Sequence, residues 1–159
     1  MNGDFELNPV PAGGGCFVYQ LASGWQLVEG YTVVVSSNCG AWGAGAAAPL
    51  GKYYLAVQKS GTLKQTVVVP SGLVGISLTL QFYMSKRLDE GSSSSVAVSV
   101  NGVALRTIAL TSGFTRYSIN TPAATSTMTI QFDDVSPVKG DQSYLMDNVT
   151  LSLAAPTSK

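Results

Sequence analysis

Asp147 is the residue whose position in the sequence calls for a chemical partner. The stretch Tyr144–Leu153 alternates like a β-strand, and successive strand side chains point to opposite faces. Asp147 therefore shares a face with four aliphatic residues, Leu145, Val149, Leu151 and Leu153. A carboxylate in an apolar layer is costly unless it is neutralised, paired or bound to a cation. We expect its partner in the acidic opening of the chain, Asn2-Gly3-Asp4-Phe5-Glu6.

A second group of residues has the composition of a sugar-binding surface. The outward row of the strand predicted over Ile76–Arg87 contains aromatic, amide and guanidinium groups, which suit stacking on a sugar ring and hydrogen bonding to its hydroxyls. The predicted ligand-binding residues are Trp42, Tyr54, Gln58, Gln81, Tyr83 and Arg87, with Asp89 or Gln142 contributing from neighbouring loops. The alternative is structural: Arg87 pairs with Asp89 or Glu90, and the tyrosines pack under loops.

Catalytic chemistry has little support in the sequence. Histidine is absent, which removes the commonest general base and the commonest zinc ligand. Asp133 and Asp134 are adjacent on a predicted strand, so their side chains face opposite ways. A glycosidase needs two carboxylates across one bond, roughly 5 to 10 Å apart. We therefore expect no enzyme activity.

Two cysteines, Cys16 and Cys39, flank a segment that contains Trp25 and the run Val33-Val34-Val35. A disulfide between them is the preferred interpretation, and it would place the protein outside the reducing cytosol. The alternative is two unrelated buried thiols.

The elements that would position these residues are all β-strands. Twelve extended pieces, two of them brief, amount to about ten short strands with turn residues between them. They are predicted over Phe5–Asn8, Cys16–Gln20, Trp25–Glu29, Tyr31–Ser36, Tyr53–Gln58, Thr62–Val69, Ile76–Arg87, Val96–Val100, Val103–Leu110, Phe114–Thr121, Thr127–Asp133 and 144–154. Asn101-Gly102 is a strong hairpin signal, and Asn38–Gly51 is predicted as a long loop. The pattern predicts an all-β, two-sheet antiparallel β-sandwich of jelly-roll form, with one domain over 1–154 and a tail over 155–159.

Composition narrows the class of partner. The 159 residues are 45% hydrophobic and only 11% charged, a balance typical of a β-rich extracellular domain. Lys and Arg number 9 against 9 Asp and Glu, without a basic run, so nucleic acid is not an expected partner. No apolar stretch approaches the length of a membrane span, so we expect no membrane insertion. Met1-Asn2-Gly3-Asp4 does not resemble a signal peptide. We expect a mature or excised domain of a secreted or cell-surface protein.

A set of short motifs occurs in one order along nearly the whole chain. They are Asn2-Gly3-Asp4-Phe5-Glu6, Gly24-Trp25, 51–58 with Gln65 following, 98–102, and Asp147-Asn148-Val149-Thr150-Leu151. Together they resemble the galactose-binding-like jelly-roll superfamily, which includes many carbohydrate-binding modules and secreted cell-wall-associated domains. The resemblance also implies that Trp25 is buried in the core.

In many members of that superfamily a calcium ion bridges the first strand, the strand after the long loop and the last strand. Carried over by position, the resemblance implies a structural Ca²⁺ held by the carboxylates of Glu6 and Asp147. Backbone oxygens near Gly3, Lys52 or Tyr53, and Asp147 would complete the site. Calcium takes several hard oxygen ligands and accepts backbone carbonyls together with carboxylates. Asp4 is an alternative to Glu6, and capping of backbone amides or pairing with a Lys or Arg is an alternative to metal binding for Asp147.

These observations predict a non-catalytic carbohydrate-binding module or lectin-like domain that contains calcium and binds a polysaccharide or glycan. The alternative is a structural subunit that self-assembles into an extracellular fibre, sheath or surface layer. Low charge and many small residues are compatible with assembly. Light scattering separates the two, because ordered polymers favour the structural subunit and a persistent monomer favours the binding module.

Overall fold

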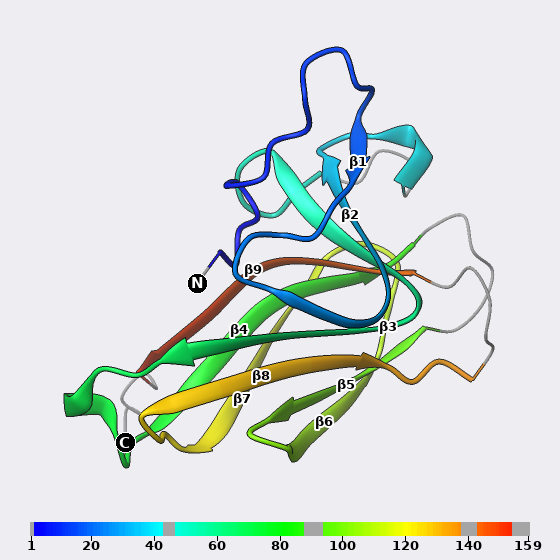
Figure 1. Cartoon of the computed structure of the whole chain (residues 1–159). Coiled ribbons are helices and arrows are strands. Elements are labelled where there is room, and N and C mark those ends of the chain that lie inside the picture. The colour runs from blue at the N-terminus through cyan, green and yellow to red at the C-terminus, as the bar shows by residue number, and fades with distance from the viewer. Residues whose placement is uncertain (1, 43–46, 88–93, 138–142, 154–159) are drawn as a thin grey trace.

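A computed structural model describes residues 2–42, 47–87, 94–137 and 143–153 (Figure 1). The strands are β1 (Phe17–Tyr19), β2 (Gln26–Ser36), β3 (Tyr53–Val68), β4 (Ser77–Lys86), β5 (Ser95–Val100), β6 (Val103–Ala109), β7 (Thr115–Ala123), β8 (Thr127–Asp134) and β9 (Ser143–Leu153). Two short 3₁₀ helices, η1 (Gly40–Trp42) and η2 (Ser71–Leu73), complete the elements, and neither could span a membrane. The predicted all-β class is confirmed, while the tail over 155–159 lies outside the described residues.

The long strand β3 connects the two layers of the sandwich. Its first half pairs with β9, from Leu55 opposite Met146 to Gln58 opposite Ser143, and its second half pairs with β8. Lys59 and Ser60, with φ angles of 57° and 55°, lie where β3 changes partner. One layer therefore contains β2, β3, β9, β4 and β7, and the other contains β3, β8, β5 and β6 (Figure 1). A strand that bends and changes sheets in this way forms a corner of a sandwich.

The main core lies between the layers. Leu80, Phe82 and Met84 point inward from β4, as the period-2 alternation predicts. Phe82 contacts Phe132 of β8 edge-on, with ring centroids 5.2 Å apart. The prediction for Trp25 is confirmed, because this side chain is only 3% exposed and its ring lies 6.2 Å from that of Phe132.

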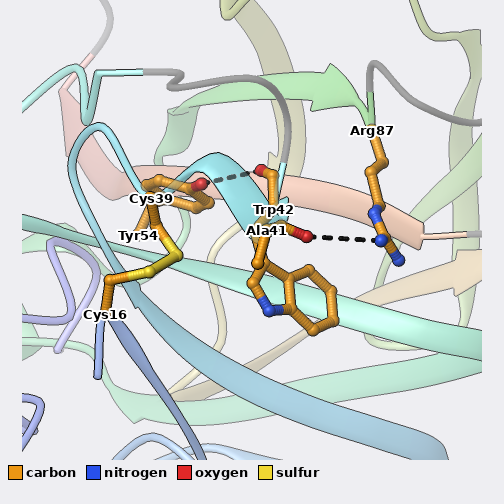
Figure 2. Close-up of a disulfide and its surroundings, with 6 residues drawn as sticks. All are labelled: Cys16, Cys39, Ala41, Trp42, Tyr54 and Arg87. Carbon is orange, nitrogen blue, oxygen red and sulfur yellow. Dashed lines mark hydrogen bonds between the residues drawn. A yellow bond between two sulfur atoms is a disulfide. The ribbon is translucent and has the colours of Figure 1, made fainter. Parts of the chain in front are cut away.

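A second, smaller apolar cluster covers the outer face of the β9 layer. Its buried members are Val33, Val35, Cys39, Trp42, Tyr54, Ala56 and Leu145. The predicted disulfide is confirmed: Cys16 and Cys39 are bonded, with their Cα atoms 5.4 Å apart (Figure 2). The bond attaches the segment after β2, including η1, to the start of β1. The described part of the loop predicted over Asn38–Gly51 therefore packs on a sheet face through Cys39 and Trp42.

Some elements differ from the sequence prediction. Phe5–Asn8 is a turn and not a strand: the Asn8 amide donates to the Phe5 carbonyl at 3.3 Å, and Phe5 has a φ angle of 58°. The pieces predicted at 25–29 and 31–36 form one strand, β2, and those at 53–58 and 62–69 form β3. The pairing between β2 and β3 continues across irregular positions, which the residue pattern suggested were the ends of separate strands.

A bulge in β9 corrects the predicted face of Asp147. Tyr83 pairs with Asp147 and Gln81 with Thr150, so β9 has one extra residue here, and Asn148 has a φ angle of 49°. An extra residue reverses the alternation beyond it. Val149 therefore packs in the main core, whereas Leu145 belongs to the outer cluster. Leu151 also packs against the main core, and Leu153 is exposed, so these residues do not form one face with Asp147.

Candidate functional site

The chain's opening and its last strand lie side by side, as predicted. The Val149 amide donates to the Gly3 carbonyl at 2.9 Å. A Cβ atom on Gly3 would lie 1.9 Å from the Val149 carbonyl oxygen, far inside van der Waals contact. Glycine at this position therefore permits the opening segment to approach β9 closely.

The Glu6 carboxylate fixes the backbone that leads into β3. Its Oε1 atom accepts hydrogen bonds from the amides of Lys52 and Tyr53, at 2.7 and 2.8 Å. Gly51 precedes these amides with a φ angle of 71°, and a Cβ atom there would lie 2.4 Å from the same oxygen. The segment Gly51-Lys52-Tyr53 can therefore fold around the Glu6 carboxylate, because Gly51 has no side chain to collide with it.

Asp147 is fully buried, with 0% of its surface exposed. Its Oδ2 accepts from the Leu50 amide at 2.9 Å, and its Oδ1 from the Asn148 amide at 2.7 Å. Burial raises the pKa of Asp147 to about 7 against the opposing effect of the two amides, and the charges of Glu6 and Asp4 raise it further. Asp147 therefore accepts backbone amides, as the capping alternative from the sequence predicted. The two charged groups that act on its pKa, Glu6 and Asp4, are both acids.

We call Asp4, Glu6 and Asp147 the acid cluster. Its oxygen donors suit a hard cation, because Ca²⁺ binds carboxylates together with backbone carbonyls. The carbonyls of Gly3 and Lys52 each accept one amide, from Val149 and Ser37, and a carbonyl oxygen has two lone pairs. Within the described ranges no three His, Cys, Asp or Glu side chains form a metal-ligating group by themselves. A bound ion would therefore need these backbone oxygens, the same kinds of ligand that the sequence predicted at Gly3, Glu6, Lys52 and Asp147.

Two residues of the predicted ligand surface are buried. Tyr54 is 0% exposed and Trp42 is 3% exposed, and the Tyr54 hydroxyl donates to the Trp42 carbonyl at 2.9 Å (Figure 2). Burial raises the pKa of Tyr54 to about 12. The Trp42 ring packs against Phe17 and Arg87, and the Tyr54 ring packs against Phe114, which corrects the expectation that both rings face a ligand. The period-2 pattern identified the outer face of β3 but gave no information about the loop that folds over it.

The remaining members of that surface make contacts within the protein. Arg87 lies over the Trp42 ring, 4.7 Å from the centroid, and donates to the Ala41 carbonyl at 3.3 Å (Figure 2). The Gln81 side chain accepts from Arg116 at 2.9 Å. Tyr83 is half-buried. Asp89 and Gln142, the predicted loop contributors, lie outside the described residues.

Gln58 contributes to a different surface, which we call the tyrosine hollow. It is a hollow of about 460 Å³ lined by Tyr19 of β1, Tyr31 of β2, and Gln58 and Lys59 of β3. Tyr19 and Tyr31 are 62% and 53% exposed, whereas Gln58 is 6% exposed. The Lys59 ammonium lies 4.9 Å from the centroid of the Tyr31 ring.

Sequence reasoning missed Tyr19, Tyr31 and Lys59. The hollow exists because β1 and β3 pair with opposite edges of β2, with Tyr19 opposite Val33 and Tyr31 opposite Gln58. Phe17 and Tyr19 share one face of their strand, and Tyr31 shares a face with Val33, so aromatic residues were visible on both strands. Nothing in the sequence indicated that these rows would be neighbours.

Comparisons with known proteins show similarity in structure and not in sequence. No family model matches the chain, and no curated protein matches it either. A solved family 61 carbohydrate-binding module in complex with β-1,4-galactotriose is similar over 97% of both chains, with a TM-score of 0.60 and 17% identity.

Two further solved structures have the same architecture. A family 35 carbohydrate-binding module from Clostridium thermocellum matches 87% of this chain and 98% of its own, with a TM-score of 0.53 and 15% identity. The K1 cleaved adhesin domain of Lys-gingipain from Porphyromonas gingivalis W83 matches 89% of this chain and all of its own, with a TM-score of 0.59 and 11% identity. The chain thus shares the β-sandwich fold of these solved structures.

Proposed function

We propose that this chain is a non-catalytic carbohydrate-binding domain of a secreted or surface protein, with a structural calcium ion at the acid cluster. The observation that carries the proposal is the tyrosine hollow, where the exposed side chains of Tyr19 and Tyr31 line one surface with Gln58 and Lys59. The shared fold supports it, because the proteins with this architecture include sugar-binding modules.

The chemistry of the hollow matches the surface of a saccharide. A pyranose ring presents C–H groups on its faces, which pack against aromatic rings, and hydroxyls at its edge, which exchange hydrogen bonds with amides. Tyr19 and Tyr31 provide the rings, and Gln58 and Lys59 provide polar groups in the lining. The volume of about 460 Å³ lies within the range of small-ligand sites.

Calcium would have a structural role in this proposal. Asp147 and Glu6 both hold the backbone between Leu50 and Tyr53, and Gly3 binds β9. A cation there would offset the mutual repulsion of the acid cluster and hold the chain's opening against β9 and the start of β3. The Cys16–Cys39 disulfide supports a location outside the reducing cytosol.

The self-assembly alternative receives no support from the outer strands of the path, β6 and β7. Arg106 lies on β6, and Arg116 and Pro122 lie on β7. Charged residues and proline on a sheet edge oppose strand addition between molecules. These two edges therefore give no support to assembly by strand addition.

A glycan array followed by isothermal titration calorimetry tests the proposal. We expect binding to at least one glycan class, with affinity reduced about tenfold or more by Tyr19→Ala or Tyr31→Ala, because each removes a stacking ring. Tyr83→Ala is the matched control from the surface predicted by the sequence. Loss of binding in Tyr83→Ala alone would mean that the ligand binds at β4 and not at the hollow. No binding in a broad screen would contradict the proposed function.

Calcium is tested separately by thermal melting in excess calcium and in excess chelator. An ion that binds only the folded state raises the melting temperature. Equal melting temperatures in the two conditions would contradict the proposed calcium site and leave the sugar-binding proposal intact.

A further inference from the structure

We propose that the tyrosine hollow selects saccharides that carry an anionic group, a uronate carboxylate or a sulfate ester, and that the Lys59 ammonium receives this group. The inference rests on the proposed sugar-binding function and adds the chemical class of the ligand.

The position of the Lys59 side chain is the first support. Lys59 has a φ angle of 57° at the bend where β3 changes partner, and its side chain is exposed. Its ammonium lies over the Tyr31 ring, 4.9 Å from the centroid. A tyrosine face attracts a cation through the ring quadrupole, so Tyr31 helps to hold the ammonium at the hollow.

The charge of the lining is the second support. Tyr19, Tyr31 and Gln58 are neutral, so Lys59 gives the lining a positive charge, and no carboxylate belongs to the lining described here. A saccharide in the hollow would displace water around the ammonium, and less water strengthens its attraction to an anion. The hydroxyls of a neutral saccharide can accept hydrogen bonds from the ammonium, but they supply no opposite charge in exchange for that lost hydration.

The overall charge of the chain makes this inference specific to the hollow. The net charge is zero, with 9 basic and 9 acidic residues, so the molecule as a whole has no reason to attract polyanions. A preference for an acidic glycan must therefore arise locally. The lysine ammonium is a compact charge without the planar, forked geometry of the arginine guanidinium. It can therefore donate to either a carboxylate or a sulfate group.

The test compares pairs of oligosaccharides with the same sugar backbone, one with the anionic group and one in which that group is esterified or removed. Calorimetry would use oligogalacturonate and its fully methyl-esterified form for the carboxylate, and a sulfated galactan oligosaccharide with its desulfated form for the sulfate. We expect the wild-type chain to bind at least one anionic form about tenfold more tightly than its neutral partner. The carboxylate and sulfate pairs show which anion the hollow accepts.

Two variants assign the preference to Lys59. Lys59→Gln removes the charge from the hollow and should equalise the affinities for the anionic and neutral forms. Lys64→Gln removes the same charge from β3 at a position outside the lining, and should keep the preference.

The outcomes separate this inference from the proposed function. Equal or tighter binding of the neutral forms would overturn the inference while sugar binding stands, as would an unchanged preference in Lys59→Gln. No binding to any glycan would overturn both.

Discussion

The acid cluster and the tyrosine hollow lie on the same jelly roll but are built in opposite ways. At the acid cluster, carboxylates accept backbone amides from Leu50, Lys52, Tyr53 and Asn148, and Asp147 is fully buried. At the hollow, two tyrosine side chains more than half exposed lie beside the exposed Lys59. The first arrangement fixes the chain, and the second leaves groups free to meet a ligand.

This difference predicts where each region contributes free energy. A change in the acid cluster alters packing and buried charge, so it should act on folding. A change in the hollow removes exposed atoms that the fold does not need, so it should act on binding. We therefore expect larger effects on stability from the acid cluster than from the hollow.

The largest effect is the pH dependence of stability without calcium. The pKa of Asp147 is raised from 3.8 to about 7 in the folded chain, so between these values the folded state binds more protons than the unfolded state. Stability from this group is therefore full below about pH 4 and is lost as pH rises through 7. In chelator, the wild type should lose on the order of 4 kcal/mol across this window relative to Asp147→Asn. Urea denaturation at pH 4, 6 and 8 measures it.

Calcium should reverse that loss, because a bound cation stabilises the ionised carboxylate. The calcium-dependent increase in melting temperature should therefore be larger at pH 8 than at pH 5, and should be absent in Asp147→Asn. An equal pH profile for the wild type and Asp147→Asn in chelator would mean that the buried carboxylate is not an electrostatic cost to the fold.

The next effect concerns the contact between the chain's opening and β9. Gly3→Ala places a Cβ atom 1.9 Å from the Val149 carbonyl oxygen, so the backbone must shift. We expect a loss of about 3 kcal/mol in the free energy of unfolding and a weaker calcium response. Gly72→Ala is the matched control, since no heavy atom lies within 4 Å of its Cβ position. If both variants unfold at the wild-type urea concentration, the opening segment does not stabilise the fold.

A smaller effect should distinguish the two N-terminal acids. Glu6 accepts two backbone amides near β3, whereas Asp4 accepts only the Glu6 amide at 3.4 Å. Glu6 also raises the pKa of Asp147 more than Asp4 does. We expect Glu6→Gln to abolish most of the calcium-dependent increase in melting temperature, and Asp4→Asn to retain most of it. The reverse result would make Asp4 the N-terminal ligand.

The sequence predicted the acid cluster better than the hollow, for a physical reason. Glu6 and Asp147 accept hydrogen bonds from backbone amides, and Gly51 makes room for Glu6. Each of the three lies in one of the short motifs that occur in order along the chain. The bulge at Asn148 was missed because period-2 alternation assumes a regular strand. The predicted contact between the two ends was confirmed even though the predicted face of Asp147 was wrong.

The ligand surface was harder to predict because it depends on which strands become neighbours. The alternation in β3 and β4 correctly separated inward from outward residues, but Trp42 and Tyr54 are buried on the outer face by contacts with residues far away in the sequence. Tyr19 and Tyr31 become neighbours only through the pairing of β1 with β2. Long-range pairing and loop coverage are tertiary properties, so local spacing could not identify this surface.

The smallest effect on stability should come from the hollow, and it is the sharpest test of the comparison. Tyr19 and Tyr31 are 62% and 53% exposed, so truncating either ring to alanine removes little buried surface. We expect each variant to change the free energy of unfolding by about 0.5 kcal/mol or less, while the same change weakens glycan binding about tenfold. Urea denaturation and calorimetry on the same protein samples measure both quantities. A stability loss as large as that of Gly3→Ala would mean that the tyrosines support the fold, and the division between a structural acid cluster and a binding hollow would fail.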